Sequence, residues 1–350
     1  MKKQWYLYAA AALFTAACSQ NPRQDSSPKA PVKTALGFDL QSLDSTARPC
    51  EDFFQYTSGG WIENNPIPES EARWGRFGVL RKRNYRKLKA LLDSVAKVEN
   101  LPKGSYAQLV SHFYKSGMDS AAIEKNGVRA LKEHFTVAKA IQTENYPQFM
   151  SFAYQNQLTM PLRLRVSIDD RNSNRHLLHL SQAGIGLPDR DYYLQEDSLS
   201  QSIQEAYRSY ITKMLKLNGM ENRNAQSAAQ DIYTFEKALA QNMMSREERR
   251  KPENTYNKKS LRYLHKKLPH LKLASLFSEN DLTLDSAIVQ QPAYLQALDS
   301  LLPLTKGGTL RDYHQFHLLR QNAAYLPQAF GQAHFDFYGR TLEGKNEMKP

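Results

Sequence analysis

Apolar side chains that recur every three or four residues constrain the fold of this chain more than any other feature of its sequence. Between Ser200 and Asn218 they follow the spacing of one helix face, and Gly219 comes next as a residue that often ends helices. The same spacing returns between Ala225 and Leu239, and the short link predicts that these two helices pack antiparallel. A mainly α-helical fold is therefore predicted, with further helices over 79–95, 106–114 and 313–326.

One segment has a different period. From Leu162 to Ile168 apolar residues alternate with polar ones, which is the pattern of a half-buried strand. Turn-forming residues at 170–174 then lead to a second run, from His176 to Leu180. The two runs predict a small antiparallel β-hairpin that braces or rims the helical domain, because two strands alone are only marginally stable.

The first residues have the pattern of a cleaved export signal. Lys2 and Lys3 precede an apolar run, Trp5–Ala17, which is shorter than the roughly 20 residues that span a bilayer. The small residues before Cys18 resemble a lipobox, in which the cysteine is acylated and becomes the new N-terminus. Thr15 departs from that motif, which usually has leucine there, and a plain signal peptide is the alternative.

These features divide the chain into three predicted parts. Residues 1–18 form a lipoprotein signal peptide with Cys18 as the acylated residue, and the polar residues 19–36 form a flexible tether. Residues 37–350 form the folded domain. The acyl anchor makes the membrane a partner and predicts an exported, membrane-anchored lipoprotein of the bacterial cell envelope, in the periplasm or at the cell surface. Only Cys50 then remains, so no internal disulfide can form.

The positive charge of the chain does not indicate a nucleic-acid partner. A formal net charge of +12 and a pI near 9.4 would permit one. However, lysine and arginine are scattered over most of the predicted helices. The densest runs, 81–87 and 246–251, are interrupted by Asn, Tyr or Glu and match no nucleic-acid-binding signature. We therefore expect a solvated, moderately basic surface and no nucleic-acid binding.

No residue pattern predicts a catalytic or metal centre. His-Glu-x-x-His, which places two imidazoles and a general base on one helix face, is absent. His176 and His179 lie on a predicted strand, where a spacing of three sends their side chains to opposite faces. His314 and His317 can share a helix face, but no nearby cysteine or carboxylate completes a ligand set, so ordinary packing is predicted. The sequence thus predicts no catalytic and no metal-binding residue.

Two further patterns favour structural roles. Gly184–Gly186 begins like a dinucleotide-binding loop, but Pro188 and Asp189 follow where a third glycine would stand, so a turn is predicted. The neighbouring carboxylates Asp169-Asp170 and Glu247-Glu248 could mimic a general acid–base pair. Both pairs lie in polar segments and are therefore predicted to be exposed to solvent.

Several segments, in order along the mature chain, resemble the neprilysin and endothelin-converting enzyme family of zinc metalloendopeptidases. The most specific is Gly184–Tyr193, whose length and composition rarely arise by chance. The others are Pro49–Tyr56, Gly59–Trp61, Ile67-Pro68 with Arg73–Gly75, Tyr256–Lys258 and Phe335–Arg340, so the resemblance covers almost the whole mature chain.

The resemblance implies a peptidase of two lobes around a cavity, with zinc on the C-terminal lobe. The N-terminal half would be a helical cap that admits short peptides. The family's His-Glu-x-x-His and downstream Glu-x-x-x-Asp would lie beyond Pro350, so the chain is expected to lack the catalytic lobe and to hold no cofactor itself. Zinc is expected in the full-length enzyme. In animal members the cysteine matching Cys50 pairs with one in the C-terminal lobe, and Ser58 stands at the family's second cysteine position.

The resemblance also assigns two substrate-binding residues. Arg73 and Arg81 match family arginines that hold the C-terminal side of the substrate, and a guanidinium can grip a carboxylate bidentately. Their spacing of eight would keep both on one side of the predicted helix. Gly78 departs from the family, which has an acidic residue there. Without the resemblance, both arginines would be interpreted as solvated surface charges.

Two hypotheses follow. The first is an incomplete peptidase that is inactive alone: a gene fragment, a frameshifted product, or a half that meets a separately encoded catalytic lobe. The second is a non-enzymatic lipoprotein of the cell envelope that binds peptides through Arg73 and Arg81. A lobe that faces another lobe should expose a large apolar patch. The first hypothesis therefore predicts poor solubility or dimerisation, and the second predicts a monomer that melts cooperatively.

Overall fold

The computed structural model describes residues 39–349, so the predicted signal peptide, its Cys18 and the predicted tether lie outside the described residues. The chain divides into two compact units, one that ends at Pro66 and one that begins at Ile67. In the first unit a 3-10 helix, Leu40–Ser42, precedes helix α2, Phe53–Asn64. Asp52 caps α2, because its carboxylate accepts a hydrogen bond from the N–H of Gln55 at 2.8 Å.

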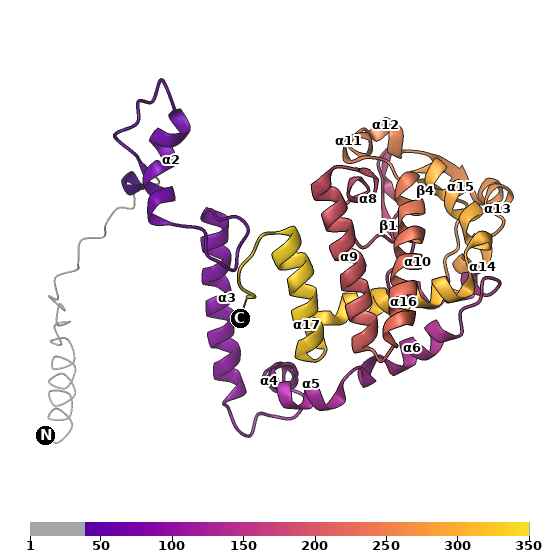
Figure 1. Ribbon diagram of the computed structural model, residues 1–350, viewed down its shortest axis with the longest axis horizontal. Helices are drawn as coiled ribbons and strands as arrows, with labels where there is room; N and C mark the ends of the chain where they lie inside the picture. The colour runs from indigo at the N-terminus through magenta and orange to yellow at the C-terminus, as the bar shows by residue number, and fades with distance from the viewer. Residues whose placement is uncertain (1–38, 350) are drawn as a thin grey trace, which may run out of the picture. The chain divides into compact units, whose positions relative to one another are not determined.

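The second unit is mainly helical, as predicted (Figure 1). The longer helices are α3 Arg76–Ala96, α4 Tyr106–Met118, α7 Tyr146–Gln155, α9 Ser198–Leu217, α10 Asn222–Gln241, α15 Pro292–Leu301 and α16 Gly307–Asn322. The shorter helices are α5 Ser120–Asn126, α6 Lys132–Lys139, α8 Asp191–Leu194, α11 Arg246–Arg249, α12 Pro252–Thr255, α13 Leu261–Lys267, α14 Leu273–Ser278 and α17 Gln328–His334. Short 3-10 helices occupy Arg129–Leu131, Leu302–Leu304 and Ala323–Tyr325, and a π-helix, Phe335–Leu342, follows α17.

Helices α9, α10 and α16 form the centre of the hydrophobic core. Helices α9 and α10 lie side by side, and α16 crosses and packs against both (Figure 1). The predicted apolar stripe of α9 is buried, including Tyr207, Ile211 and Met214. The stripe of α10 includes several buried alanines, whose small side chains let a neighbouring helix approach closely. The antiparallel pair predicted from the sequence is therefore confirmed.

Helix α9 ends as its sequence predicts. Gly219 has a φ of 92°, a left-handed conformation that glycine adopts without steric cost. The chain reverses there, and the N–H of Met220 donates to the carbonyl of Leu215 at 3.1 Å. This bond satisfies a carbonyl that the end of the helix would otherwise leave without a partner. The reversal directs the chain back along α9 as α10.

The hairpin is present but belongs to a larger sheet. Strands β1, Leu162–Asp169, and β2, Asn172–Gln182, pair antiparallel, with Leu164 opposite Leu180. Two strands that the sequence pattern did not reveal complete a mixed sheet in the order β1-β2-β4-β3, in which β4 is parallel to β2 and β3 antiparallel to β4. Strand β3 is Lys258–Ser260 and strand β4 is Ser286–Val289. Strand β1 is an edge strand, and β2 is buried between two neighbours.

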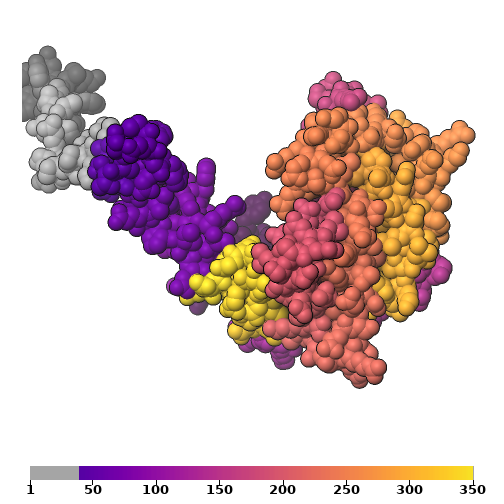
Figure 2. Space-filling model, turned by 45° about the horizontal axis from the view of Figure 1, so that its top comes forward, coloured from indigo at the N-terminus to yellow at the C-terminus, as the bar shows by residue number. Residues whose placement is uncertain are grey.

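The last helical segments lie on the surface of the second unit. Figure 2 shows the C-terminal segment, in yellow, at the surface beside α9, and α17 and the π-helix after it both pack against that helix. Over residues 39–349, no helix is both long enough and apolar enough to cross a lipid bilayer.

Candidate functional site

An open groove of about 650 Å³ lies in the second unit, where several loops meet the end of the sheet. Its walls come from the end of α7 and the loop after it, the start of β1, the loop from β2 to α8, and the C-terminal end of α16. Met243 and Arg249 complete the lining. The apolar residues of the groove include Met160, Leu162, Leu164, Ile185, Leu187 and Pro188.

The charged residues of the groove are mostly arginines. Arg163, Arg165, Arg190, Arg249 and Arg320 line it, against the single carboxylate of Asp189. Asp189 is buried and already has cationic partners, the Nε of Arg246 at 2.7 Å and a terminal nitrogen of Arg249 at 3.7 Å. The groove therefore carries a surplus of positive charge.

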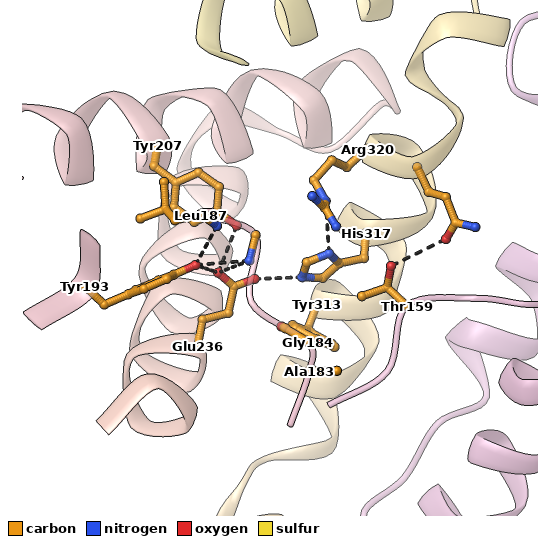
Figure 3. Close-up of polar contacts among 12 residues, drawn as sticks. Thr159, Ala183, Gly184, Leu187, Tyr193, Tyr207, Glu236, Tyr313, His317 and Arg320 are labelled. Atoms are coloured by element: carbon orange, nitrogen blue, oxygen red, sulfur yellow. Dashed lines mark hydrogen bonds and ion pairs between the residues drawn. The ribbon is translucent and has the colours of Figure 1, made fainter. Parts of the chain in front are cut away.

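A buried hydrogen-bond network connects the core to this groove (Figure 3). At its centre is Glu236 on α10, whose side chain is inaccessible to solvent. Its Oε2 accepts from the hydroxyl groups of Tyr193 at 2.6 Å and Tyr207 at 2.9 Å, and from the N–H of Gly186 at 3.3 Å. Its Oε1 lies 2.7 Å from Nε2 of His317. All the donors around this carboxylate come from elements that are distant in the sequence.

The network reaches the groove through His317 and Arg320, which lie one turn apart on α16. Burial lowers the pKa of His317, although the hydrogen bond with Glu236 opposes this effect, so we assign a neutral ring. Nε2 then carries the proton and donates to Glu236, which leaves Nδ1 free to accept from Nε of Arg320 at 3.2 Å. A terminal nitrogen of Arg320 donates to the hydroxyl of Tyr338 at 3.3 Å. The guanidinium is thus held in place at the edge of the groove.

The loop between β2 and α8 is fixed by the same network and forms the turn that the sequence predicted. Gly184 has a φ of 90°, and its carbonyl accepts from Tyr313 at 2.7 Å. A Cβ atom at Gly186 would overlap the hydroxyl group of Tyr207. The most specific segment of the sequence resemblance therefore serves to shape one wall of the groove.

The two predicted substrate-binding arginines lie in another part of the second unit. Arg81 is on α3, but Arg73 precedes the first residue of that helix, so the expectation that both lie on one helix was wrong. Both are exposed. A terminal nitrogen of Arg81 lies 3.4 Å from Glu71, whose pKa is lowered mainly by a hydrogen bond from Lys349. Arg73 makes no hydrogen bond or ion pair with the described residues.

The structure gives a steric reason for glycine at position 78. A side chain at this position would begin 2.8 Å from the ring of Trp74, which lies against the start of α3. The amine of Lys82, one turn further along α3, lies 5.8 Å from the centre of the same ring. The glycine therefore lets the tryptophan pack on the helix, at the position where the resembling family has an acidic residue.

The histidine pairs are placed as predicted, but one has a partner that the sequence did not reveal. On β2, His176 is exposed and His179 is buried. On α16, His314 and His317 are both buried, and Nε2 of His314 lies 2.8 Å from the hydroxyl of Tyr146. The carboxylate beside His317 is Glu236, 81 positions away in the chain. Among residues 39–349, no group of three or more His, Cys, Asp or Glu side chains could hold a metal ion.

One residue of the two carboxylate pairs was predicted incorrectly, while Asp170 is exposed as predicted. Asp169 is buried rather than exposed, because it accepts hydrogen bonds from Tyr256 at 2.8 Å and from Lys258 at 3.2 Å. The N–H of Arg171 also donates to it, and this bond is the main cause of the lowered pKa of Asp169. Asp169 therefore joins β1 to the start of β3. Glu247 and Glu248 are exposed, as predicted, and Glu248 takes part in the capping of α11.

Cys50, in the first unit, is exposed and forms no disulfide with the described residues. Cys18, the predicted acylation site, lies outside them.

Comparisons with known proteins agree on one family. The N-terminal profile of the family described as "Peptidase family M13" matches residues 49–350. Endothelin-converting enzyme 1 of Cavia porcellus is 30% identical over 308 residues, which cover 84% of this chain and 40% of that protein. An endothelin-converting enzyme homolog of Locusta migratoria is 29% identical over 339 residues, which cover 91% of this chain and 46% of that protein.

A solved structure agrees with the sequence comparisons. The crystal structure of the Mycobacterium tuberculosis zinc metalloprotease ZMP1 with an inhibitor matches with a TM-score of 0.82 and 26% identity. The match covers 89% of this chain and 48% of that one. The chain thus spans less than half the length of each of these three relatives.

Proposed function

Because this chain belongs to peptidase family M13 and corresponds to the N-terminal region of its neprilysin-like members, we propose that it is the substrate-gating lobe of a zinc metalloendopeptidase. In this proposal the lobe cooperates with a catalytic C-terminal lobe in the proteolysis of short peptides. The chain alone has no peptidase activity.

The observation that carries this proposal is the apolar surface of α3 and α4. None of the side chains of α3 is buried. The side chains of Phe77 on α3 and of Tyr106 and Phe113 on α4 are exposed by 88%, 89% and 83%. Leu80, Leu88, Leu91 and Leu109 are also exposed. Many exposed apolar side chains on two helices that pack together are typical of a surface that another part of a protein covers. We assign it to contact with the catalytic lobe.

The zinc of the family has no matching ligands in the described part of this chain. Tetrahedral zinc sites need His, Cys or carboxylate donors that converge, and residues 39–349 bring no three such side chains together. His317 already shares its Nε2 proton with Glu236, and His314 is bonded to Tyr146. The donor set therefore does not fit zinc, and in our proposal the metal belongs to the catalytic lobe.

Arg73 and Arg81 complete the proposed gating role. Their exposed guanidinium groups would hold the C-terminal side of a peptide that enters from the catalytic lobe. Glu71 would compete for Arg81, since the two side chains lie 3.4 Å apart. Residues 1–36 support a further proposal, that Cys18 is acylated and that the protein is an envelope lipoprotein anchored to a membrane.

Metal analysis and a peptidase assay on the purified chain test the proposal. After dialysis against zinc, we expect less than one zinc ion per chain and no hydrolysis of internally quenched peptides. Addition of a catalytic lobe encoded in the same genome should restore hydrolysis, and Arg73→Ala with Arg81→Ala should then raise the KM for peptides with a free C-terminus. Stoichiometric zinc together with hydrolysis by this chain alone would overturn the proposal.

A further inference from the structure

We propose that the groove beside Arg320 binds a carboxylate group of an extended peptide. This inference adds a substrate class to the proposed function, namely peptides with an acidic group, and it rests on that function for the choice of a peptide as ligand. The site is distinct from Arg73 and Arg81, which do not line the groove.

The charge of the groove is not balanced. Five arginines line it, and its one carboxylate, Asp189, is already bound to Arg246 and to Arg249. Asp189 is therefore not free to neutralise the other arginines. Guanidinium groups gathered in a concave site with few carboxylates attract anions from solution.

Arg320 has hydrogen-bond partners for only part of its guanidinium group. Its Nε donates to His317 and one terminal nitrogen donates to Tyr338, whereas the other terminal nitrogen has no partner among the described residues. No carboxylate of residues 39–349 lies within ion-pair distance of this guanidinium. The nearest negative charge in its network, Glu236, is separated from it by the ring of His317. Arg320 is thus oriented and half-buried, and its charge is not paired.

The guanidinium group of Arg320 is held in place by its neighbours. Glu236 fixes the ring of His317 and this ring fixes the guanidinium, while Tyr338 is itself bonded to the carbonyl of Gly186 at 2.7 Å. An anion that binds Arg320 does not have to immobilise a flexible side chain, and this lowers the entropic cost of binding. The buried polar network around Glu236 thereby orients the guanidinium of Arg320 for binding.

The shape and lining of the groove suit a peptide segment. Arg163 and Arg165 on β1 extend the positive charge along the groove, and Arg163 has no partner among the described residues. Strand β1 is the edge of the sheet, so an extended chain can lie along it. Apolar residues such as Leu164, Ile185 and Pro188 lie beside the arginines and can contact the residues that flank the carboxylate. A volume of about 650 Å³ accommodates a few residues.

The carboxylate can come from an acidic side chain or from the C-terminus of the peptide. Isothermal titration calorimetry with the full chain distinguishes the two. One peptide is acetylated and amidated and carries one glutamate among leucines and alanines. The second has glutamine in its place, and the third is the glutamine peptide with a free C-terminus. We expect the glutamate peptide or the free C-terminus to bind at least about tenfold more tightly than the capped glutamine peptide.

Three variants assign the binding to the groove. Arg320→Gln and Arg163→Gln should each weaken binding, Arg320→Gln by about tenfold or more because it removes a charge-assisted hydrogen bond. Arg163 is exposed, so its replacement keeps the test valid if Arg320→Gln melts at a lower temperature. Arg262→Gln is the matched control, because it removes the same charge from a residue that is exposed on α13 and does not line the groove.

The proposal is overturned if the three peptides bind equally, if Arg163→Gln and a folded Arg320→Gln bind as the unaltered chain does, or if inorganic phosphate displaces the peptide at equal concentration. The last result would indicate a general anion site. If the groove does not bind a carboxylate but a catalytic lobe still restores hydrolysis, the proposed function stands without the groove site. Carboxylate binding by a chain that hydrolyses peptides alone would contradict only the proposed function.

Discussion

At the scale of single residues, the core of the second unit contains a carboxylate, Glu236, that is buried without a directly bonded cation. Glu236 accepts hydrogen bonds from two tyrosines, one histidine and one backbone N–H. A buried charge is costly unless each of its acceptor positions is satisfied, and here four donors satisfy them. Arg320 lies beyond the ring of His317, so the arrangement that satisfies Glu236 also orients the groove arginine.

A second buried histidine makes the stability of the unit depend on pH. Burial lowers the pKa of His314 well below its usual value, and the nearby His317 adds to the effect. The unfolded chain therefore binds a proton that the folded chain does not, so stability is complete above the unfolded pKa of about 6.5 and is lost as pH falls below it. When the pH falls from roughly 7.5 to roughly 5.5, the free energy of unfolding should decrease by about 1.4 kcal/mol because of His314.

Urea unfolding of unaltered chain and of His314→Gln at the two pH values measures this effect. Glutamine keeps a polar partner for Tyr146 but does not titrate, so the variant should lose less stability on acidification. The matched control is His176→Gln, because His176 is exposed on β2. An identical loss of stability in unaltered chain and in His314→Gln would contradict the assignment.

At the scale of elements, the loop from β2 to α8 is where backbone and core meet most closely. Gly186→Ala should destabilise the second unit by about 1–3 kcal/mol, because the added methyl group overlaps the hydroxyl of Tyr207 and disturbs its bond with Glu236. Gly117→Ala on α4 is the control, since no atom lies within 4 Å of the added Cβ. There, alanine should stabilise the helix by about 0.5–1 kcal/mol. Equal melting temperatures of the two variants would show that the loop yields without cost.

The elements that the sequence predicted are those with strong local patterns. Helices α9 and α10 have long apolar stripes and clear ends, and the residues of β1 alternate. Strands β3 and β4 are too short to show a period, and they form by pairing with strands that the fold places beside them, β4 with β2 and β3 with β4. Burial within β1 also differs from the alternation, because Val166 and Ile168 are about half exposed.

The candidate site was less predictable than the fold for a related reason. The sequence singled out His317, but its carboxylate partner is on a different helix, and no local spacing connects α10 with α16. Asp169 was predicted to be exposed because its neighbours are polar, whereas Tyr256 and Lys258 bury it from 87 and 89 positions away. The groove arginines come from four separate segments. Contacts of this kind are set by the tertiary fold.

At the scale of the whole molecule, α3 and α4 present a different problem from the core. A helix is stabilised mainly by packing of its apolar face, yet α3 packs mostly on α4 and leaves its other apolar side chains in solvent. Between the two helices a hollow of about 480 Å³ is lined by residues such as Leu92, Leu109 and Phe113. Such a surface is stable in water only at a cost, and self-association is the simplest way to cover it.

We therefore expect the purified chain to form dimers or larger species through α3 and α4. Phe113→Glu should reduce this association, because it places a charge on the apolar surface. The side chain of Phe113 is 83% exposed and is not part of the core. Leu199→Glu on α9 is the matched control, since Leu199 is exposed by 69% but lies outside that surface. Sedimentation velocity over a range of concentrations separates the outcomes. Association in the unaltered chain and the control, but not in Phe113→Glu, would support a surface made for a second lobe, whereas a monomer at every concentration would favour a lobe that binds peptides without one.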